Sequence, residues 1–477
     1  MDMYHLTLAF LVATSCRLAW ANHRDHLRDI NLWWKAAPAD ISNSNGGTEK
    51  FIRVFLPVYL LVMASDWLQG AYVYTLYKDE KHLPESTVAS LFTCGFLAAA
   101  MAALVVGSLA DRYGRRLACL AFCVLYTASC LTKISDSVAV LWAGRLLGGV
   151  CTTLLFSTFE SWMVTECFTQ GGKDASLYTM FGVMSTLNSI VAIASGLVGE
   201  GLVAATGTKV SPFLAACVCL VLAFLFMAKH WGENYGGSAE LARLGLPEKS
   251  MLASLVKDKR VLLLGLISCC FEGSMYIFVF LWSAAMQSAH GHSTTATASA
   301  GKSDAHSPDG IPFGLIFATF MAAMMLGSQA FTYMSTRSIS WTSRPSPDML
   351  LTLAATVASI SLVSTVLLKQ ETLTFWAFCL FEASLGIYFP AVGAQRAMLV
   401  GDGERAKTYG ILRIPLNMFV VLSLATMVEG DSHRDMLFIL CGGLLLLASL
   451  AAVCLESCNM NVKAAALVGR IGGEAVG

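Results

Sequence analysis

Apolar runs long enough to cross a lipid bilayer recur along the whole chain, and this repetition constrains the possible fold more than any other feature. An α-helix needs about 20 mostly apolar residues to span the hydrocarbon core. One such run lies near the N-terminus, at about 3–20. Twelve more, numbered here helices 1 to 12, lie at about 52–77, 88–110, 117–135, 137–165, 178–205, 211–229, 261–286, 311–336, 349–368, 373–398, 409–428 and 435–456. The predicted fold class is therefore an all-α polytopic membrane protein.

Composition agrees with a membrane location and excludes several functional classes. Charged residues make up 13% of the chain, about half the share of an average soluble domain. The net charge of +0 gives no electrostatic reason to expect a nucleic-acid partner. The sequence has no zinc-ligand spacing, phosphate-binding glycine loop or nucleophile elbow. We therefore expect neither an enzyme nor a bound cofactor or metal.

The longest polar break inside the twelve-helix core separates six helices from six. This break, at 230–260, predicts a division of the chain into five parts. They are an N-terminal helix with its linker (1–50), a first six-helix half (51–229), a central loop (230–260), a second six-helix half (261–456) and a tail (457–477).

The distribution of Lys and Arg predicts which side of the membrane each loop faces. If the central loop is cytoplasmic, 22 of the 32 Lys and Arg residues lie on its side and seven lie outside, which matches the positive charge of cytoplasmic loops. The tail is then cytoplasmic and the N-terminus external. The first segment has no Lys or Arg before its apolar run, so we expect it to be retained although Ala19-Trp20-Ala21 resembles a cleavage site. The loop at 287–310 is expected outside and flexible, because it is rich in small and polar residues.

The two six-helix halves resemble each other in parallel register. Gly107-Ser108-Leu109-Ala110, near the end of helix 2, is matched by Gly327-Ser328-Gln329-Ala330, near the end of helix 8. Parallel repeats are a known plan of membrane transporters, with the substrate site near the bilayer midplane. The alternative is chance matching, because apolar helices use few residue types. Further pairs in the same order are Asp66 with Glu272, Phe159-Glu160 with Phe381-Glu382, and Asn188 with Asn417.

The segment that follows helix 2 carries a resemblance to a known family. Gly107-Ser108-Leu109-Ala110-Asp111-Arg112-Tyr113-Gly114-Arg115-Arg116 resembles the signature loop of the major facilitator superfamily. Arg145-Leu146-Leu147-Gly148-Gly149 resembles its weaker helix 4 motif. The resemblance implies a major facilitator fold with two six-helix halves, here with one extra N-terminal helix, and transport by alternating access. It implies a conformational role for the loop residues Gly107, Asp111, Arg112, Gly114, Arg115 and Arg116.

Within this superfamily the chain resembles the molybdate-anion transporter branch. The matching pieces run from helix 1 to helix 11. This resemblance implies that the substrate is molybdate, a tetrahedral dianion, and that the protein spans a cell membrane many times. The pieces include Ala64 with Asp66-Trp67-Leu68-Gln69, Cys130-Leu131-Thr132-Lys133, Leu154-Leu155-Phe156-Ser157, Trp231 to Tyr235, Ile277 to Trp282, Phe313 to Phe317, Gly386 to Pro390 and Arg413-Ile414-Pro415.

Ionisable residues inside the predicted helices are the candidate functional groups. Each costs at least about 2.5 kcal/mol to place in a bilayer, so we interpret them as functional. Four carboxylates and two guanidiniums give a formal charge of −2. Such a charge repels a dianion unless some carboxyls are protonated, so protons are a candidate coupling ion. The six residues are Asp66, Arg145, Glu160, Glu272, Glu382 and Arg413.

Two roles are predicted for these groups. Arg145 and Arg413 are candidate anion ligands, because the planar guanidinium donates paired hydrogen bonds to oxyanions. The acids are candidates for proton coupling or gating, with Glu160 and Arg413 at similar depth for an ion pair and Asp66 within reach of Arg145. The candidate ligands are completed by Ser65, Ser157 and Asn417, and the candidate acids are Asp66, Glu160, Glu272 and Glu382.

Other readings of these residues stay open. Arg145 is also compatible with a structural salt bridge, and Glu272 and Glu382 with lone protonated acids. The acidic excess would suit a proton-coupled carrier of an organic or cationic solute. A transporter-shaped nutrient sensor is a further alternative, although the tail after Leu455 is short for a signalling appendage.

Overall fold

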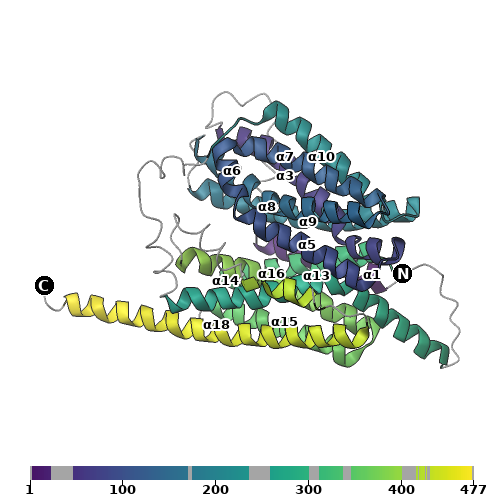
Figure 1. The fold of residues 1–477 in the computed structure, drawn as a ribbon. Coiled ribbons are helices and arrows are strands. Elements are labelled where there is room, and N and C mark those ends of the chain that lie inside the picture. The colour runs from purple at the N-terminus through teal and green to yellow at the C-terminus, as the bar shows by residue number, and fades with distance from the viewer. Residues whose placement is uncertain are drawn as a thin grey trace. The chain divides into compact units, whose positions relative to one another are not determined.

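The computed structural model describes residues 3–22, 47–169, 174–235, 258–299, 311–336, 345–399, 415–416, 418–424, 426 and 430–474. Within these ranges every regular element is a helix, as the apolar runs predict (Figure 1). The chain forms two compact units, and each is described here by itself.

The first unit comprises Met1–Leu246, His306–Ala322 and Val421–Glu429. In this unit α5 and α7 both pack on α8, while α3 packs on α9 and α10. Its helices are α1 (Met3–Asn22), α3 (Gly47–Gly70), α4 (Val73–Thr75), the π-helix η1 (Leu76–Glu80), α5 (Glu85–Ala103), α6 (Val106–Tyr113), α7 (Arg115–Leu131), the 3₁₀ turn η2 (Thr132–Ile134), α8 (Val138–Thr169), α9 (Asp174–Thr206) and α10 (Ser211–His230).

The second unit comprises Pro247–Ala305, Ala323–Val420 and Gly430–Gly477. Here α15 packs on α16 and α18, and α13 packs on the same two helices. The helices are α13 (Lys259–Ser299), α15 (Pro347–Leu368), α16 (Glu371–Leu399) and α18 (Asp431–Glu474), with α14 (Phe313–Thr336) divided between the two units at Ala322.

The predicted membrane spans agree closely with these helices. Among the described residues, ten helices are long and apolar enough to cross a membrane, or eleven if the bent pair Arg53–Gly70 and Val73–Glu80 is one span. They correspond to predicted helices 1 to 10 and 12. Predicted helix 11, at 409–428, lies mostly outside the described residues. α1 is helical as expected but is not among the spans, so its crossing of the membrane stays a prediction.

The predicted flexible loop at 287–310 is wrong in its first half. α13 does not end with the apolar run near 286 but continues as a helix to Ser299. The segment from 287 to 299 contains three Ala and no Pro, so nothing in it forces the backbone out of the helical conformation. Residues 300–310 lie outside the described part of the chain.

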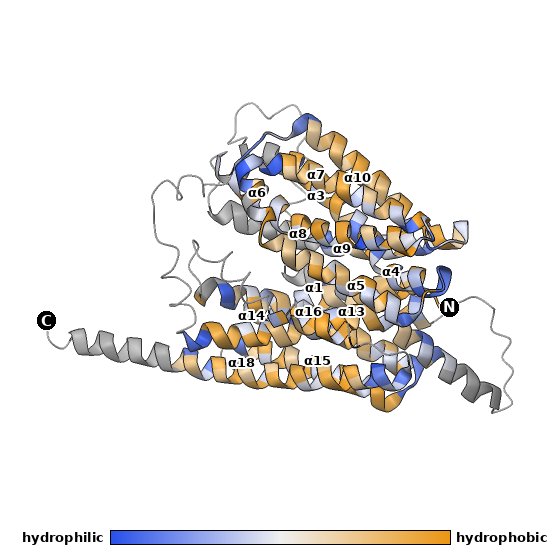
Figure 2. Ribbon diagram, in the orientation of Figure 1, coloured by the Kyte–Doolittle hydropathy of each residue, from blue (hydrophilic) through white to orange (hydrophobic). Residues whose placement is uncertain are grey.

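Large apolar side chains cover the outer faces of the helices. Leu367 is 75% exposed, Leu104 68% and Ile360 62%. Hydrophobic residues dominate the lengths of the helices, and hydrophilic residues collect near several helix ends (Figure 2). A soluble monomer rarely exposes apolar surface of this extent, so these faces are suited to lipid.

Predicted helix 1 is not straight, and its bend positions several buried aromatic residues. The axis turns by 47° between Arg53–Gly70 and Val73–Glu80. Beyond the bend the chain enters η1, in which Leu76 and Tyr77 are fully buried. Irregular turns of this type are common at functional sites in helices.

Candidate functional site

Asp66, a predicted gating residue of α3, is held by a neutral partner. Its Oδ1 accepts a hydrogen bond of 2.6 Å from the Tyr126 hydroxyl on α7. Beside it, the Trp67 indole donates a hydrogen bond of 2.8 Å to Asn188 Oδ1 on α9. These bonds tie α3 to two neighbouring helices. Within the described residues Asp66 forms no ion pair, and the contact with Arg145 that the sequence suggested is not made.

The two predicted serine ligands both bond to their own helices. The Ser65 hydroxyl is completely buried and donates to the Val62 carbonyl at 2.6 Å. Ser157 donates to the Thr153 carbonyl at 2.6 Å. A hydroxyl has a single proton to donate, so neither serine offers a donor to an anion in this conformation. Their role as ligands stays a prediction.

Arg145, the predicted anion ligand of α8, packs against α5. Its Nε donates to the Leu91 carbonyl at 3.2 Å, and its guanidinium lies 4.4 Å from the centre of the Phe92 ring. Gly95 makes room for it, because a Cβ there would lie 3.0 Å from a terminal guanidinium nitrogen. Among the described residues no carboxylate pairs with Arg145. The guanidinium therefore keeps donors for another partner.

The predicted gate between Glu160 and Arg413 is not tested by the structure. Glu160 is exposed and lies in the last third of α8. Arg413 lies outside the described residues, as does Asn417, the remaining predicted anion ligand. The ion pair and both ligand assignments therefore stay predictions.

An ion pair and hydrogen bonds hold the signature loop in place. Asp111, at the end of α6, forms a 2.7 Å ion pair with Arg115 in the first turn of α7. Arg115 also donates to the Ser161 carbonyl on α8 at 3.1 Å and to the Thr165 hydroxyl. The loop thus joins α6, α7 and α8. The conformational role of the loop residues, which include Gly107, Arg112 and Arg116, stays a prediction.

Glu233, which the sequence interpretation did not single out, completes this loop. Its carboxylate accepts from the backbone N–H groups of Arg116 at 2.7 Å and Leu117 at 3.2 Å. These are free donors at the start of α7, and a carboxylate there also interacts favourably with the helix dipole. Gly114 has φ +116°, and a Cβ on it would lie 2.4 Å from the Glu233 carboxyl carbon. Position 114 therefore requires glycine.

In the second unit, Glu272 has a cationic partner that the sequence interpretation missed. Its Oε1 accepts a 2.8 Å bond from the terminal nitrogen of Arg396 and a 3.1 Å bond from the Tyr388 hydroxyl. Arg396 also donates to Ser268 Oγ at 2.8 Å. Glu272 is 3% exposed, and Tyr388 stacks on Phe271 with ring centres 4.0 Å apart. This is a buried charge pair between α13 and α16, and Glu272 is not a lone acid.

Glu382, by contrast, is buried without a cation. It lies in α16 and is 4% exposed. Its neighbour Phe381 packs against Phe278, with ring centres 4.6 Å apart. Among the described residues none forms an ion pair or hydrogen bond with Glu382. An isolated buried carboxylate is costly, so this position retains its predicted role as a protonatable group.

The predicted set of embedded charges therefore lacked the buried Lys133 and the half-buried Arg396. Arg396 lies within predicted helix 10 (373–398) but was counted among the cytoplasmic residues, whereas in α16 its side chain reaches Glu272 on α13. Lys133 was counted as external, but it is 2% exposed in η2. Both follow apolar runs directly. Long basic side chains at helix ends can point in either direction along the helix, so position alone did not identify them.

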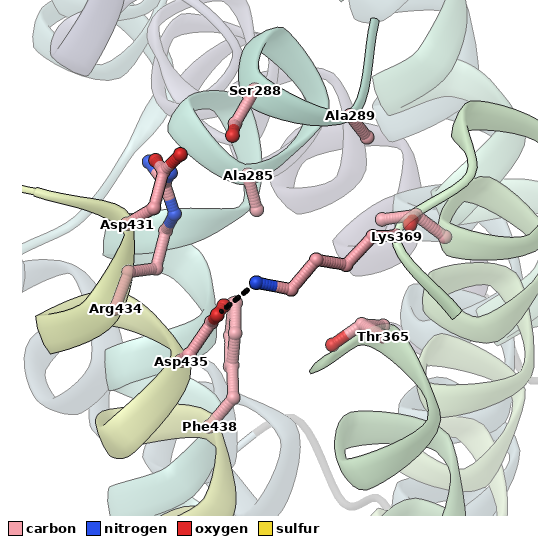
Figure 3. Close-up of a pocket in the computed structure, with 10 residues that line it drawn as sticks. Ala285, Ser288, Ala289, Thr365, Lys369, Asp431, Arg434, Asp435 and Phe438 are labelled. Atoms are coloured by element: carbon pink, nitrogen blue, oxygen red, sulfur yellow. Dashed lines mark hydrogen bonds and ion pairs between the residues drawn. The ribbon is translucent and has the colours of Figure 1, made fainter. Parts of the chain in front are cut away.

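One small pocket lies in the second unit, lined by Lys369, Arg434, Asp431, Asp435 and neighbours from α13 (Figure 3). Its volume is about 30 Å³, which is room for only a few water molecules. Lys369 pairs with Asp435 at 2.6 Å, and Arg434 pairs with Asp431. Because its charges are mutually satisfied, this pocket is a poor substrate site. Elsewhere in the described residues, no group of three or more His, Cys, Asp and Glu is placed to hold a metal ion.

Comparison with known proteins agrees with this helical architecture. A major facilitator family profile, described as sugar transporters with 12 transmembrane helices, matches residues 30–383. A crystal structure of the peptide transporter POT superposes with a TM-score of 0.63 over 85% of this chain and 94% of its own, at 14% identity. At this identity the likeness concerns the fold alone.

Two curated relatives are much closer in sequence. The molybdate-anion transporter of Xenopus tropicalis is 33% identical over 433 residues, which cover 89% of this chain and 90% of the relative. That of Danio rerio is 32% identical over 462 residues, covering 88% and 89%. This protein is therefore a membrane transporter, not an enzyme, and the chain belongs to the major facilitator superfamily, in the branch that contains the molybdate-anion transporters.

Proposed function

We propose that this protein imports molybdate across a cell membrane by alternating access. The observation that carries the proposal is the relationship to molybdate-anion transporters at 33% identity over 89% of the chain. The match covers 89% of this chain and 90% of the relative, so it extends over most of both units.

Three features of the chain support a carrier of a dianion. Each unit encloses a basic side chain that the predicted set of embedded charges lacked, namely the buried Lys133 and the half-buried Arg396. Arg145 holds a guanidinium with unused donors, a group suited to tetrahedral oxyanions. The division into two helical bundles suits a carrier that works by movement of one bundle against the other.

We further propose that protons accompany the anion, and that Glu382 is the group that takes them up. Glu382 is buried and unpaired in the described structure, whereas Glu272 is paired with Arg396. A buried carboxyl without a counter-charge is stabilised by protonation. Protonation of Glu382 therefore offsets the negative charge that the bound anion brings into the helices.

The test is uptake of isotopically labelled molybdate by cells that lack their own molybdate carrier. Cells that express this chain should take up molybdate with saturation, while vector controls and cells expressing Arg145→Ala should not. Uptake at the vector level, with the protein shown to be present in the membrane, would refute the proposal.

A carrier of cationic solutes is the second candidate, because Asp66 and Glu382 lack cationic partners among the described residues. The Glu272–Arg396 pair weakens this reading by removing one of the acids on which it rested. Competition experiments separate the two candidates. Molybdate uptake that sulfate or tungstate reduces, and that organic cations leave unchanged, supports the anion carrier.

A further inference from the structure

Lys133 is a buried lysine of the first unit without an acidic partner. It lies in the turn η2, after α7, and is 2% exposed. Its ammonium nitrogen is 5.4 Å from the centre of the Tyr77 ring. Among the described residues it forms no ion pair and no hydrogen bond. Burying an ammonium group in this way is costly unless an anion compensates it.

Tyr77 presents a second unsatisfied group at the same place. It is completely buried in η1, beyond the bend of predicted helix 1. Its hydroxyl has no hydrogen-bond partner in the described structure. A buried hydroxyl without a partner costs about 1–3 kcal/mol. A native fold therefore rarely retains one unless a molecule outside the chain satisfies it.

Arg145 joins this group through tight packing of η2 on α8. The Ser129 hydroxyl donates to the Gly144 carbonyl at 2.7 Å. A Cβ on Gly144 would lie 1.9 Å from the Thr132 hydroxyl oxygen, so the Thr132 side chain packs directly on the backbone of α8 at Gly144. Lys133 follows Thr132 in the chain, and Arg145 follows Gly144. The packing thus holds the two segments that carry Lys133 and Arg145 against each other.

The electrostatics of this group are unbalanced. Arg145 is close enough to interact electrostatically with both Lys133 and the Tyr77 hydroxyl. Like charges brought together in a poorly hydrated site repel each other. The nearby Lys81 differs, because it pairs with Asp136 at 2.5 Å. Within the described residues no carboxylate pairs with Lys133 or Arg145, so the group lacks a negative charge.

We propose that Lys133, Arg145 and Tyr77 form a binding site for a tetrahedral oxyanion. Two cationic groups match the charge of a dianion, and the tyrosine hydroxyl and guanidinium add directed donors to its oxygens. The site lies in the part of the first unit that the charge distribution predicts to be near the external face. This inference rests on the proposed function and assigns molybdate to this site, while sulfate and phosphate share the chemistry that the site recognises.

The experiment uses the purified full-length protein in detergent, with molybdate, sulfate and phosphate as separate probes. Binding and thermal melting are measured for Lys133→Met, Tyr77→Phe and the wild type. Lys81→Met is the matched control, because it removes a positive charge from the same region that already has an acidic partner. Molybdate uptake in cells is measured for the same four proteins.

Lys133→Met should weaken molybdate binding at least tenfold, equivalent to about 1.4 kcal/mol. Tyr77→Phe should weaken it by about the same factor, because it removes a hydrogen bond to a charged group. Lys81→Met should bind as the wild type does. Without anion, Lys133→Met should melt at or above the wild-type temperature, because an uncompensated charge has been removed. A purely structural lysine predicts a lower melting temperature and unchanged anion binding.

The outcomes separate this inference from the proposed function. Wild-type molybdate affinity in both Lys133→Met and Tyr77→Phe overturns the site, even if the protein transports molybdate. If the wild type transports no molybdate but binds sulfate or phosphate, and both variants lose that binding, the oxyanion site stands and the proposed function fails. If Lys133→Met does not fold, the nearly isosteric Tyr77→Phe decides the question alone.

Discussion

The buried pair of Glu272 and Arg396 allows the sharpest prediction about stability. Replacing Arg396 with Met keeps most of the apolar stem but removes the cation that pairs with Glu272, which is 3% exposed and also accepts a hydrogen bond from the neutral Tyr388 hydroxyl. Removing one partner of a buried ion pair costs about 3–5 kcal/mol, because the other charge remains without compensation. Glu272→Gln should cost less, because an amide oxygen can still accept both hydrogen bonds.

The expected loss of free energy of unfolding can be expressed as a fall in melting temperature. The second unit has about 200 residues, and a domain of this size loses about 2–4 °C for each kcal/mol of destabilisation. Arg396→Met should therefore lower the melting temperature by roughly 6–20 °C. Combining it with Glu272→Gln should restore part of the loss, because no charge is then left unpaired.

Thiol reactivity is a suitable assay. All cysteines are free, and Cys270, Cys379 and Cys441 are buried in the second unit. A dye that becomes fluorescent on reaction with thiols therefore reports unfolding of the protein, this unit included. Lys369→Ala is the control, because it breaks an exposed pair in the same unit (Figure 3), where the expected cost is at most about 1 kcal/mol.

The reasoning is refuted if Arg396→Met melts no lower than Lys369→Ala, or if the double variant is no more stable than Arg396→Met. Either result would mean that the 2.8 Å contact does not stabilise the folded unit. A large loss in Arg396→Met that Glu272→Gln partly reverses would confirm that the charge on Glu272 causes it.

Four further predictions follow from the structure and the proposed function. Arg145→Lys should raise the half-saturating molybdate concentration about tenfold or more, whereas normal affinity in well-expressed protein would contradict anion binding by the guanidinium. Gly114→Ala should lower the melting temperature, because residue 114 has a φ of +116° and the added Cβ would collide with the Glu233 carboxyl group. Adding Glu233→Ala to this variant should remove the collision but not the backbone strain. Uptake should increase as the external pH falls, because protonation neutralises the carboxyl group, and Glu382→Gln should flatten this dependence; an unchanged pH profile would exclude Glu382 from coupling. Tags at the two ends, probed on intact cells, should be accessible at the N-terminus alone, and surface labelling of the C-terminus would overturn the predicted orientation.

The helical framework could be predicted from the sequence because its causes are local. Each span is an apolar run of the required length, and the central polar break lies between the sixth and seventh core helices. Helix ends were less accurate. α13 extends to Ser299 because no proline or other helix-breaking residue interrupts it there. Hydropathy indicates where a helix leaves the apolar region but not where the helix ends.

Partners of the charged residues could not be predicted, because they depend on packing between distant segments. Glu272 and Arg396 are 124 positions apart and meet only because α13 and α16 pack together. Glu233 binds the start of α7 from the far end of α10. By contrast, Asp66 was correctly selected as an embedded acid, while its partner Tyr126 was not. The sequence identifies a charged residue directly. It does not identify the hydrogen-bond partner, because hydroxyl and backbone groups occur throughout the chain.

The two cations that the sequence interpretation missed change the argument about coupling. Counting only the predicted groups, four carboxylates face two guanidiniums, and protonation was needed to make even the empty carrier attractive to an anion. With Lys133 and Arg396 included, the predicted set holds four carboxylates and four cationic groups. Two further buried acids accept hydrogen bonds from neutral side chains, Glu85 from Tyr74 and Asp348 from Gln395, and the buried Arg434 pairs with Asp431. Within the predicted set, neutrality of the empty state then requires no protons, and the uncompensated charge arises when the dianion enters. Since Glu272 is held by Arg396 and Asp66 by Tyr126, Glu382 is the buried acid best able to take up a proton at that step. Proton uptake should therefore accompany anion binding and not precede it.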